Sequence, residues 1–142
     1  MNAKEYLKRL VYIDVDINAR IAELAQVRAN LQVAKSSAPK PISVQEGHES
    51  VYDDRYLKLF ELDEAINCEI RKLTDLKVSA RGRIDRCKNP LHSVILREKY
   101  INRKSWEELE DIFGYTRRQL HRIHGDALQD FTDQNKDVTK CH

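Results

Sequence analysis

Two helix starts, eleven residues apart, constrain this chain more than any other feature of its sequence. They lie in residues 105–123, SWEELEDIFGYTRRQLHRI. Ser105 and Glu108 have the S-x-x-E spacing of a capping box, and Thr116 and Gln119 have the related T-x-x-Q spacing. In such a box, each of the two side chains accepts a hydrogen bond from the backbone N–H of the other residue. The sequence therefore predicts helices over about 106–113 and 117–131.

A glycine stands between the two predicted helices. Gly114 falls where the first helix must stop and the chain must reverse, a position that favours left-handed backbone geometry. Two short helices joined by such a turn form a helix-turn-helix unit, whose second helix enters the DNA major groove. We therefore expect residues 117–131 to be a DNA-reading helix.

The two faces of the second predicted helix differ in chemistry. The side chains expected to face the core are Leu120, Ile123, Ala127 and Phe131. The residues expected to face DNA are Arg117, Arg118, Gln119, His121 and Arg122, with Gly125 beyond them. Arginine can bond guanine O6 and N7, and glutamine can bond adenine N6 and N7. A charged face that is merely solvated is the competing interpretation.

Further cations precede this unit along the chain. Lys99, Arg103 and Lys104 lie at the expected turn before residue 105, and we expect them to bind backbone phosphates. A second basic group, residues 81–88, could bind phosphate or only be solvated. On the first helix, Trp106, Leu109, Ile112 and Phe113 are expected to be core, with an acidic outer face that could dock a partner protein.

Charge is unevenly distributed along the chain. Residues 1–80 hold 12 Lys/Arg and 13 Asp/Glu, residues 81–124 hold 11 and 6, and residues 125–142 hold 2 and 4. The positive charge therefore lies in the segment that carries the expected reading helix. A basic face of this kind is typical of a phosphate-binding surface.

The first half of the chain predicts two long helices. Apolar residues recur every three or four positions over residues 3–34 and again over 51–87. Residues 36–50 contain Pro39 and Pro41 and predict a loop between them. Each helix therefore has one apolar stripe. An antiparallel, coiled-coil-like helical hairpin would pack the two stripes together, and self-association through the same stripes to form a homo-oligomer is the alternative.

A fresh helix start follows this half. Asn89 is expected to be an N-cap, with Pro90 at the first helical position. We therefore predict an all-α protein with three parts: a long helical hairpin over residues 1–88, a three-helix helix-turn-helix domain over 89–132, and a frayed polar tail over 133–142.

Several classes of function lack their signals in the sequence. No nucleotide-binding loop, dinucleotide fingerprint or nucleophile elbow occurs, so we expect neither an enzyme nor a cofactor. His121 and His124 have helical spacing, but no further ligands complete a metal site, and we expect His124 to bond backbone at the core edge. Three scattered cysteines and the lack of an apolar run indicate a cytoplasmic protein with no membrane partner.

Residues 96–128, LREKYINRKSWEELEDIFGYTRRQLHRIHGDAL, resemble region 4 of bacterial sigma factors. They are still more similar to the C-terminal part of phage-encoded sigma-like regulators of the ArpU and RinA type. The resemblance implies a transcription regulator that binds promoter DNA in a bacterial host cell, with RNA polymerase as a partner. One position departs from the pattern: Glu110 stands where such units usually have Ala or Gly because the two helices touch there.

We therefore expect a sequence-specific regulator that binds double-stranded DNA. Two other classes of protein remain open at this point. One is an oligomeric DNA-packaging adaptor, and the other is a protein-interaction module that docks on polymerase without reading DNA.

Overall fold

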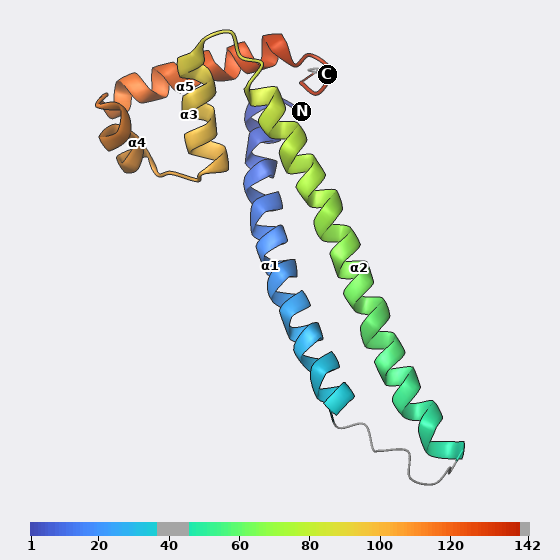
Figure 1. The fold of residues 1–142 in the computed structure, drawn as a ribbon. Helices are drawn as coiled ribbons and strands as arrows, with labels where there is room; N and C mark the ends of the chain where they lie inside the picture. Colours follow the sequence, from blue (N-terminus) through green and yellow to red (C-terminus); the bar gives the residue numbers. More distant parts are fainter. Residues whose placement is uncertain (37–45, 140–142) are drawn as a thin grey trace. The chain divides into compact units, whose positions relative to one another are not determined.

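A computed structural model describes the backbone of residues 1–36 and 46–139 and the side chains of residues 1–34 and 54–139. These residues form helices and no strand, which confirms the all-α prediction (Figure 1). The helices are α1 (Ala3–Ser36), α2 (Glu46–Ile84), α3 (Pro90–Leu96), the π-helical segment η1 (Arg97–Ile101), α4 (Trp106–Phe113) and α5 (Arg117–Gln134). None of the helices in this part of the chain has an apolar stretch long enough to cross a membrane.

The chain divides into two compact units, and both long helices contribute to each. One unit comprises Met1–Val15 and Asp75–His142, and the other comprises Asp16–Thr74. The divisions fall inside α1 and α2, whereas the sequence predicts a boundary at residue 88. The first turns of α1 and the end of α2 therefore belong to the same unit as α3, α4 and α5.

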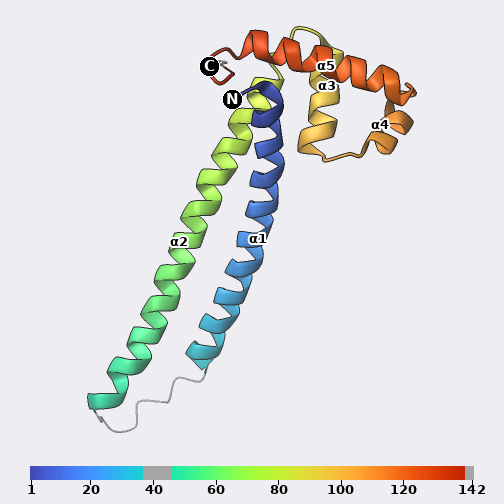
Figure 2. The ribbon, with the colours of Figure 1, turned by 180° about the vertical axis from the view of Figure 1, so that it is seen from behind.

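In the Asp16–Thr74 unit, α1 and α2 lie side by side (Figure 2). Leu24 and Val27 of α1 are buried with Ile66 of α2, and an ion pair joins Arg28 to Asp63 at 3.0 Å. A second ion pair joins Arg20 to Glu69.

The apolar stripes of this unit are only partly buried. Ile21 and Leu62, which the sequence places in these stripes, are 50% and 41% exposed. Contact with a single partner helix buries only a narrow seam, so residues at the edge of a stripe stay in solvent.

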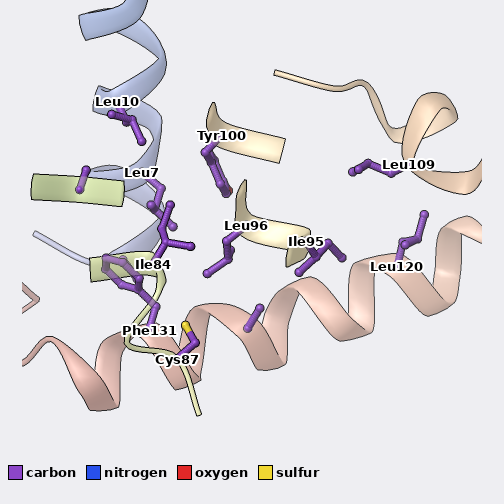
Figure 3. Packing of buried hydrophobic residues seen from close by; sticks show 13 residues of the cluster. Leu7, Leu10, Ile84, Cys87, Ile95, Leu96, Tyr100, Leu109, Leu120 and Phe131 are labelled. Carbon is purple, nitrogen blue, oxygen red and sulfur yellow. The ribbon is translucent and has the colours of Figure 1, made fainter. Parts of the chain in front are cut away.

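The other unit holds the larger core. Leu7 and Leu10 of α1 pack with Ile84 of α2 and with Phe131 of α5, and all four are at most 2% exposed (Figure 3). Residues from α3, η1 and α4 complete the cluster: Ile95, Leu96, Tyr100 and Leu109. Five helices and the π-helical segment thus contribute to one cluster.

The start of α3 follows the sequence prediction, and the helix passes into the π-helical segment after Leu96. Asn89 is the N-cap and accepts a hydrogen bond from the backbone N–H of Leu91 at 3.0 Å, with Pro90 at the first helical position. The helix then widens into η1, where the N–H of Asn102 donates to the carbonyl of Arg97 at 3.0 Å. No sequence pattern indicates this π-helical segment, which carries the buried Tyr100.

The end of the chain is packed through residue 139, so the prediction of a frayed tail is wrong for this part. Asn135 is fully buried, and its side-chain amide donates to the carbonyls of Arg83 and Phe131 at 3.1 and 3.0 Å. Thr139 is 3% exposed and donates to the carbonyl of Asn135 at 2.8 Å. Polar side chains are packed here because each finds a backbone acceptor.

Of the loop predicted over residues 36–50, Ser36 belongs to α1 and residues 46–50 belong to α2, which begins at Glu46. The rest of that loop lies outside the described residues, as do Cys141 and His142.

Candidate nucleic-acid interface

Both predicted capping boxes are present, and they set where α4 and α5 begin. The N–H of Ser105 donates to Glu108 Oε2 at 2.8 Å, and the N–H of Glu108 donates to Ser105 Oγ at 3.2 Å. At α5, the N–H of Thr116 donates to Gln119 Oε1 at 2.9 Å, and the N–H of Gln119 donates to Thr116 Oγ1 at 3.2 Å. A cap of this kind contributes about 1 kcal/mol to stability.

The turn between these helices depends on a left-handed residue. Gly114 has φ +71°, and its N–H donates to the carbonyl of Glu110 at 2.9 Å, which ends α4. No neighbouring atom lies within 4 Å of a Cβ built at this position. The glycine is therefore required by backbone conformation and not by crowding.

The two helices meet through a small apolar contact. Leu109 of α4 and Leu120 of α5 are both fully buried, and Ala127 and Phe131 continue the buried side of α5 as predicted. The prediction for Ile112 is wrong, since its side chain is 51% exposed. Trp106, Leu109 and Phe113 already occupy the one inward face that a two-turn helix has.

Glu110 bonds across the turn. Its Oε1 lies 3.2 Å from Nε of Arg117, and the two side chains are 33% and 49% exposed. The carboxylate thus turns outward at the position where the units that residues 96–128 resemble usually have Ala or Gly. Arg117 is therefore engaged with a carboxylate of the protein itself.

The outward side of α5 carries the remaining predicted contacts. Arg118, His121 and Arg122 are exposed, and no ion pair or side-chain hydrogen bond engages Arg118 or Arg122 among the side chains of residues 1–34 and 54–139. Gly125 has open space at its Cβ position, so no side chain covers the backbone at the far end of this face. Gln119 is exposed as well, but its amide oxygen is held by the capping box.

A cluster of rings fixes this part of α5 to α4 and η1. His121 lies against Trp106 with ring centroids 4.2 Å apart, and the rings of Trp106 and His124 are nearly perpendicular with centroids 5.2 Å apart. His124 is buried, and its Nε2 lies 2.8 Å from the Tyr100 hydroxyl. The expected backbone partner for His124 is therefore wrong, because a side-chain hydroxyl from η1 takes that place.

Burial and nearby cations change the protonation of this cluster. Desolvation, together with the ammonium groups of Lys4 and Lys99, lowers the pKa of His124 to about 4. Burial also raises the pKa of Tyr100 to about 12. At neutral pH, the tyrosine hydroxyl therefore donates to a neutral imidazole.

Of the three cations predicted to bind phosphate, Lys99 lies in η1, and Arg103 and Lys104 lie in the turn between η1 and α4. The Lys99 ammonium sits over the Trp106 ring, 4.4 Å from its centroid, and desolvation lowers the pKa of this lysine. Lys104 is half-buried, and its carbonyl accepts from Lys99 Nζ at 3.5 Å. Arg103 has φ +55°, and its Nε lies 3.4 Å from Oδ2 of Asp14.

These cations line an open hollow of about 750 Å³ together with the first turns of α1. From α1 come Lys4, Lys8, Val11 and Tyr12, and from α4 and α5 come Trp106 and His121. No pattern in the sequence connects these α1 residues with the basic segment. Only tertiary packing brings positions nearly a hundred residues apart to one surface.

The second basic group has a structural role. Arg83 forms an ion pair with Asp137 at 2.8 Å, and Arg86 donates to Oδ1 of Asn135 at 3.3 Å. These arginines hold the end of the chain. Among the side chains of residues 1–34 and 54–139, no group of three His, Cys, Asp or Glu residues is arranged to hold a metal ion.

No curated protein and no solved structure matches this chain. One family model does, over residues 32–132, which are 101 of the 142 residues. The matched range contains α2, α3, α4 and most of α5. The chain therefore belongs to the family described as "Protein of unknown function (DUF1492)".

Proposed function

We propose that this protein is a sequence-specific, duplex DNA-binding transcriptional regulator. In this proposal, α4 and α5 form a helix-turn-helix unit, α3 and η1 support it, and α5 enters the major groove. The resemblance of residues 96–128 to region 4 of sigma factors and to phage sigma-like regulators points to the same function.

One observation carries the proposal: α5 has a free cationic side opposite a fully buried one. Arg118 and Arg122 are exposed with no carboxylate partner in the described part of the chain, while Leu120 and Ala127 on the other side are 0% exposed. An arginine without an intramolecular partner can form a bidentate contact with guanine in the major groove. The capping box at Thr116 and Gln119 holds the backbone of this first turn in place.

The contacts of α5 rank its candidate residues. Arg118 and Arg122 are the main candidates for base contacts, and His121 can reach a base edge or a phosphate. Arg117 must leave Glu110, and Gln119 must leave its capping box, before either reads a base. We therefore assign these two residues a secondary role.

The long helices form the rest of the proposed architecture. In the Asp16–Thr74 unit, Arg28 of α1 pairs with Asp63 of α2. Arg20, which is earlier in α1, pairs with Glu69, which is later in α2. This order supports an antiparallel hairpin.

Ile21 and Leu62 remain exposed on this hairpin and provide apolar surface for self-association or for a protein partner. A large ring in light scattering would favour a DNA-packaging adaptor, whereas a monomer or dimer favours the regulator.

The test of the proposal is selection of bound sequences from a pool of random duplexes, followed by binding measurements by fluorescence anisotropy. We expect an enriched sequence, and we expect the Arg118→Ala and Arg122→Ala variants each to lose about 1–3 kcal/mol of affinity for it. The matched control is Arg55→Ala plus Arg71→Ala, which removes two exposed arginines from α2. Absence of any enriched sequence contradicts the proposal and favours a module that docks on polymerase only.

RNA polymerase is the protein partner that the resemblance implies. The outer side of α4 presents Ile112, 51% exposed, beside the exposed Asp111 and Glu108. An apolar side chain with acidic neighbours suits a protein contact. Ile112→Ser should weaken binding to purified polymerase and leave DNA affinity unchanged. Loss of both would place Ile112 in the fold of the unit instead.

A further inference from the structure

The hollow beside α4 brings together cations from two distant parts of the chain. Lys4, Lys8 and Tyr12 are spaced four residues apart, so they share one face of α1. Across from them lie Lys99, Arg103 and Lys104, at the turn before α4. All of these residues belong to the same compact unit as α5.

Positive charge in the hollow exceeds the negative charge near it. Two carboxylates are close: Glu108 lines the hollow but is bonded to the N–H of Ser105, and Asp14 is shared by Arg103 and Lys77. Neither Lys4 nor Lys8 forms an ion pair within the residues that the structure describes. Converging like charges repel one another, so the arrangement suits an anionic ligand.

Two details show that this surface is held in place without a ligand. Arg103 keeps a left-handed backbone, φ +55°, which costs free energy in a residue other than glycine. Lys99 is fixed over the Trp106 ring, where burial lowers the pKa of its ammonium. A bound anion would favour the charged form of Lys99, which burial disfavours.

The chemistry of the hollow fits phosphate groups better than a nucleoside. The Trp106 ring already carries the Lys99 ammonium and the His121 ring, so it is engaged and offers a base little surface for stacking. Five cationic side chains in the hollow remain as the principal groups that can bind phosphate. His121 lines the hollow and also stands on the exposed side of α5, so the hollow is continuous with the proposed reading face.

We propose that Lys4 and Lys8 of α1 bind the phosphate backbone of the same DNA duplex that α5 reads, so that the hollow holds the backbone flanking the major-groove contact. This inference rests on the proposed function, and it adds the start of the chain to the DNA-binding surface. A DNA contact at this place makes α1 more than an oligomerisation element.

The experiment uses the full chain and a short fluorescent duplex of random sequence, with affinity measured by anisotropy over a salt titration. Each phosphate contact contributes about 0.9 to the slope of log K against log salt. Lys4→Ala plus Lys8→Ala should therefore reduce the slope by about 2 and weaken binding by roughly tenfold or more at 0.1 M salt. Lys4→Arg plus Lys8→Arg should keep the wild-type slope.

The matched control is Lys58→Ala plus Lys72→Ala, which removes two exposed lysines from α2 and should leave the slope unchanged. A second readout locates the contact: hydroxyl-radical footprints on a selected duplex should shorten at one edge in the Lys4, Lys8 variant. A role in folding alone would not produce a footprint that shortens at a single edge.

The outcomes separate this inference from the proposed function. If the wild type binds DNA and the Lys4, Lys8 variant keeps both its slope and its footprint, the inference is wrong and the role of α5 stands. The inference is also wrong if the slope falls by the same amount in the Lys58→Ala plus Lys72→Ala control, because the effect is then one of net charge. If the wild type binds no duplex, the proposed function is wrong, and the inference that rests on it is wrong as well.

Discussion

Acid should destabilise this protein through one buried histidine. His124 is 7% exposed on α5, touches Trp106 of α4 and bonds Tyr100 of η1. It therefore joins the three segments that position the proposed reading face. Protonation places a charge in that site, next to Lys4 and Lys99.

The magnitude follows from the pKa of this residue. The value falls from 6.5 to about 4 on folding, so below pH 6.5 the unfolded chain binds a proton that the folded chain does not. The stabilising contribution is fully present above pH 6.5 and is lost as the pH falls toward 4. The free energy of unfolding should drop by about 1.4 kcal/mol per pH unit in this window, or about 2 kcal/mol between pH 7 and pH 5.

The assay is urea unfolding of the wild type and of His124→Gln at a series of pH values. Glutamine can accept the hydrogen bond of the Tyr100 hydroxyl but does not titrate. We expect the variant to be less stable at pH 7 and to lack the extra loss of about 2 kcal/mol on acidification. His121→Gln, which removes an exposed ring from the same helix, is the matched control. Equal acid sensitivity in the wild type and in His124→Gln would refute the reasoning.

Three further perturbations test the fold of the unit, each measured as a change in unfolding free energy. Gly114→Ala should destabilise it by about 1 kcal/mol or more because φ is +71°, whereas Gly125→Ala, in an open helical position, should be neutral or slightly stabilising. Thr116→Ala should cost about 1 kcal/mol through loss of the cap, and no loss would mean that α5 begins without it. Leu120→Ala should cost about 2–5 kcal/mol because the side chain is fully buried, and a cost below 1 kcal/mol would contradict the packing of α4 on α5.

Local chemistry made much of the fold predictable from sequence. Helix capping depends on residues only a few positions apart. The spacing of Ser105–Glu108 and Thr116–Gln119 therefore predicts where α4 and α5 begin, and the glycine between them predicts where α4 ends. Asn89 and Pro90 act in the same way at α3. Helical periodicity likewise predicts that Leu120 and Phe131 are buried, because the inward side of a helix is set by its repeat.

The features that sequence did not predict depend on contacts between distant segments. His124 has its partner in η1, 24 residues earlier, and no pattern indicates either the hydrogen bond or the π-helical widening that carries Tyr100. Asn135 reads as part of a polar tail, yet it is buried because the carbonyl of Arg83 accepts its amide. The pairing of Glu110 with Arg117 changes the expected site, since one predicted DNA contact is already bonded to a carboxylate of the protein itself.

Protection of guanine N7 from methylation tests the central claim most directly, because N7 lies in the major groove and is the atom that arginine contacts there. With a duplex recovered by selection, the account predicts guanines protected by the wild-type protein. It also predicts that Arg118→Ala and Arg122→Ala each remove protection at a different guanine. Binding with every guanine N7 still reactive, or protection that neither variant changes, would contradict the claim that this side of α5 reads DNA.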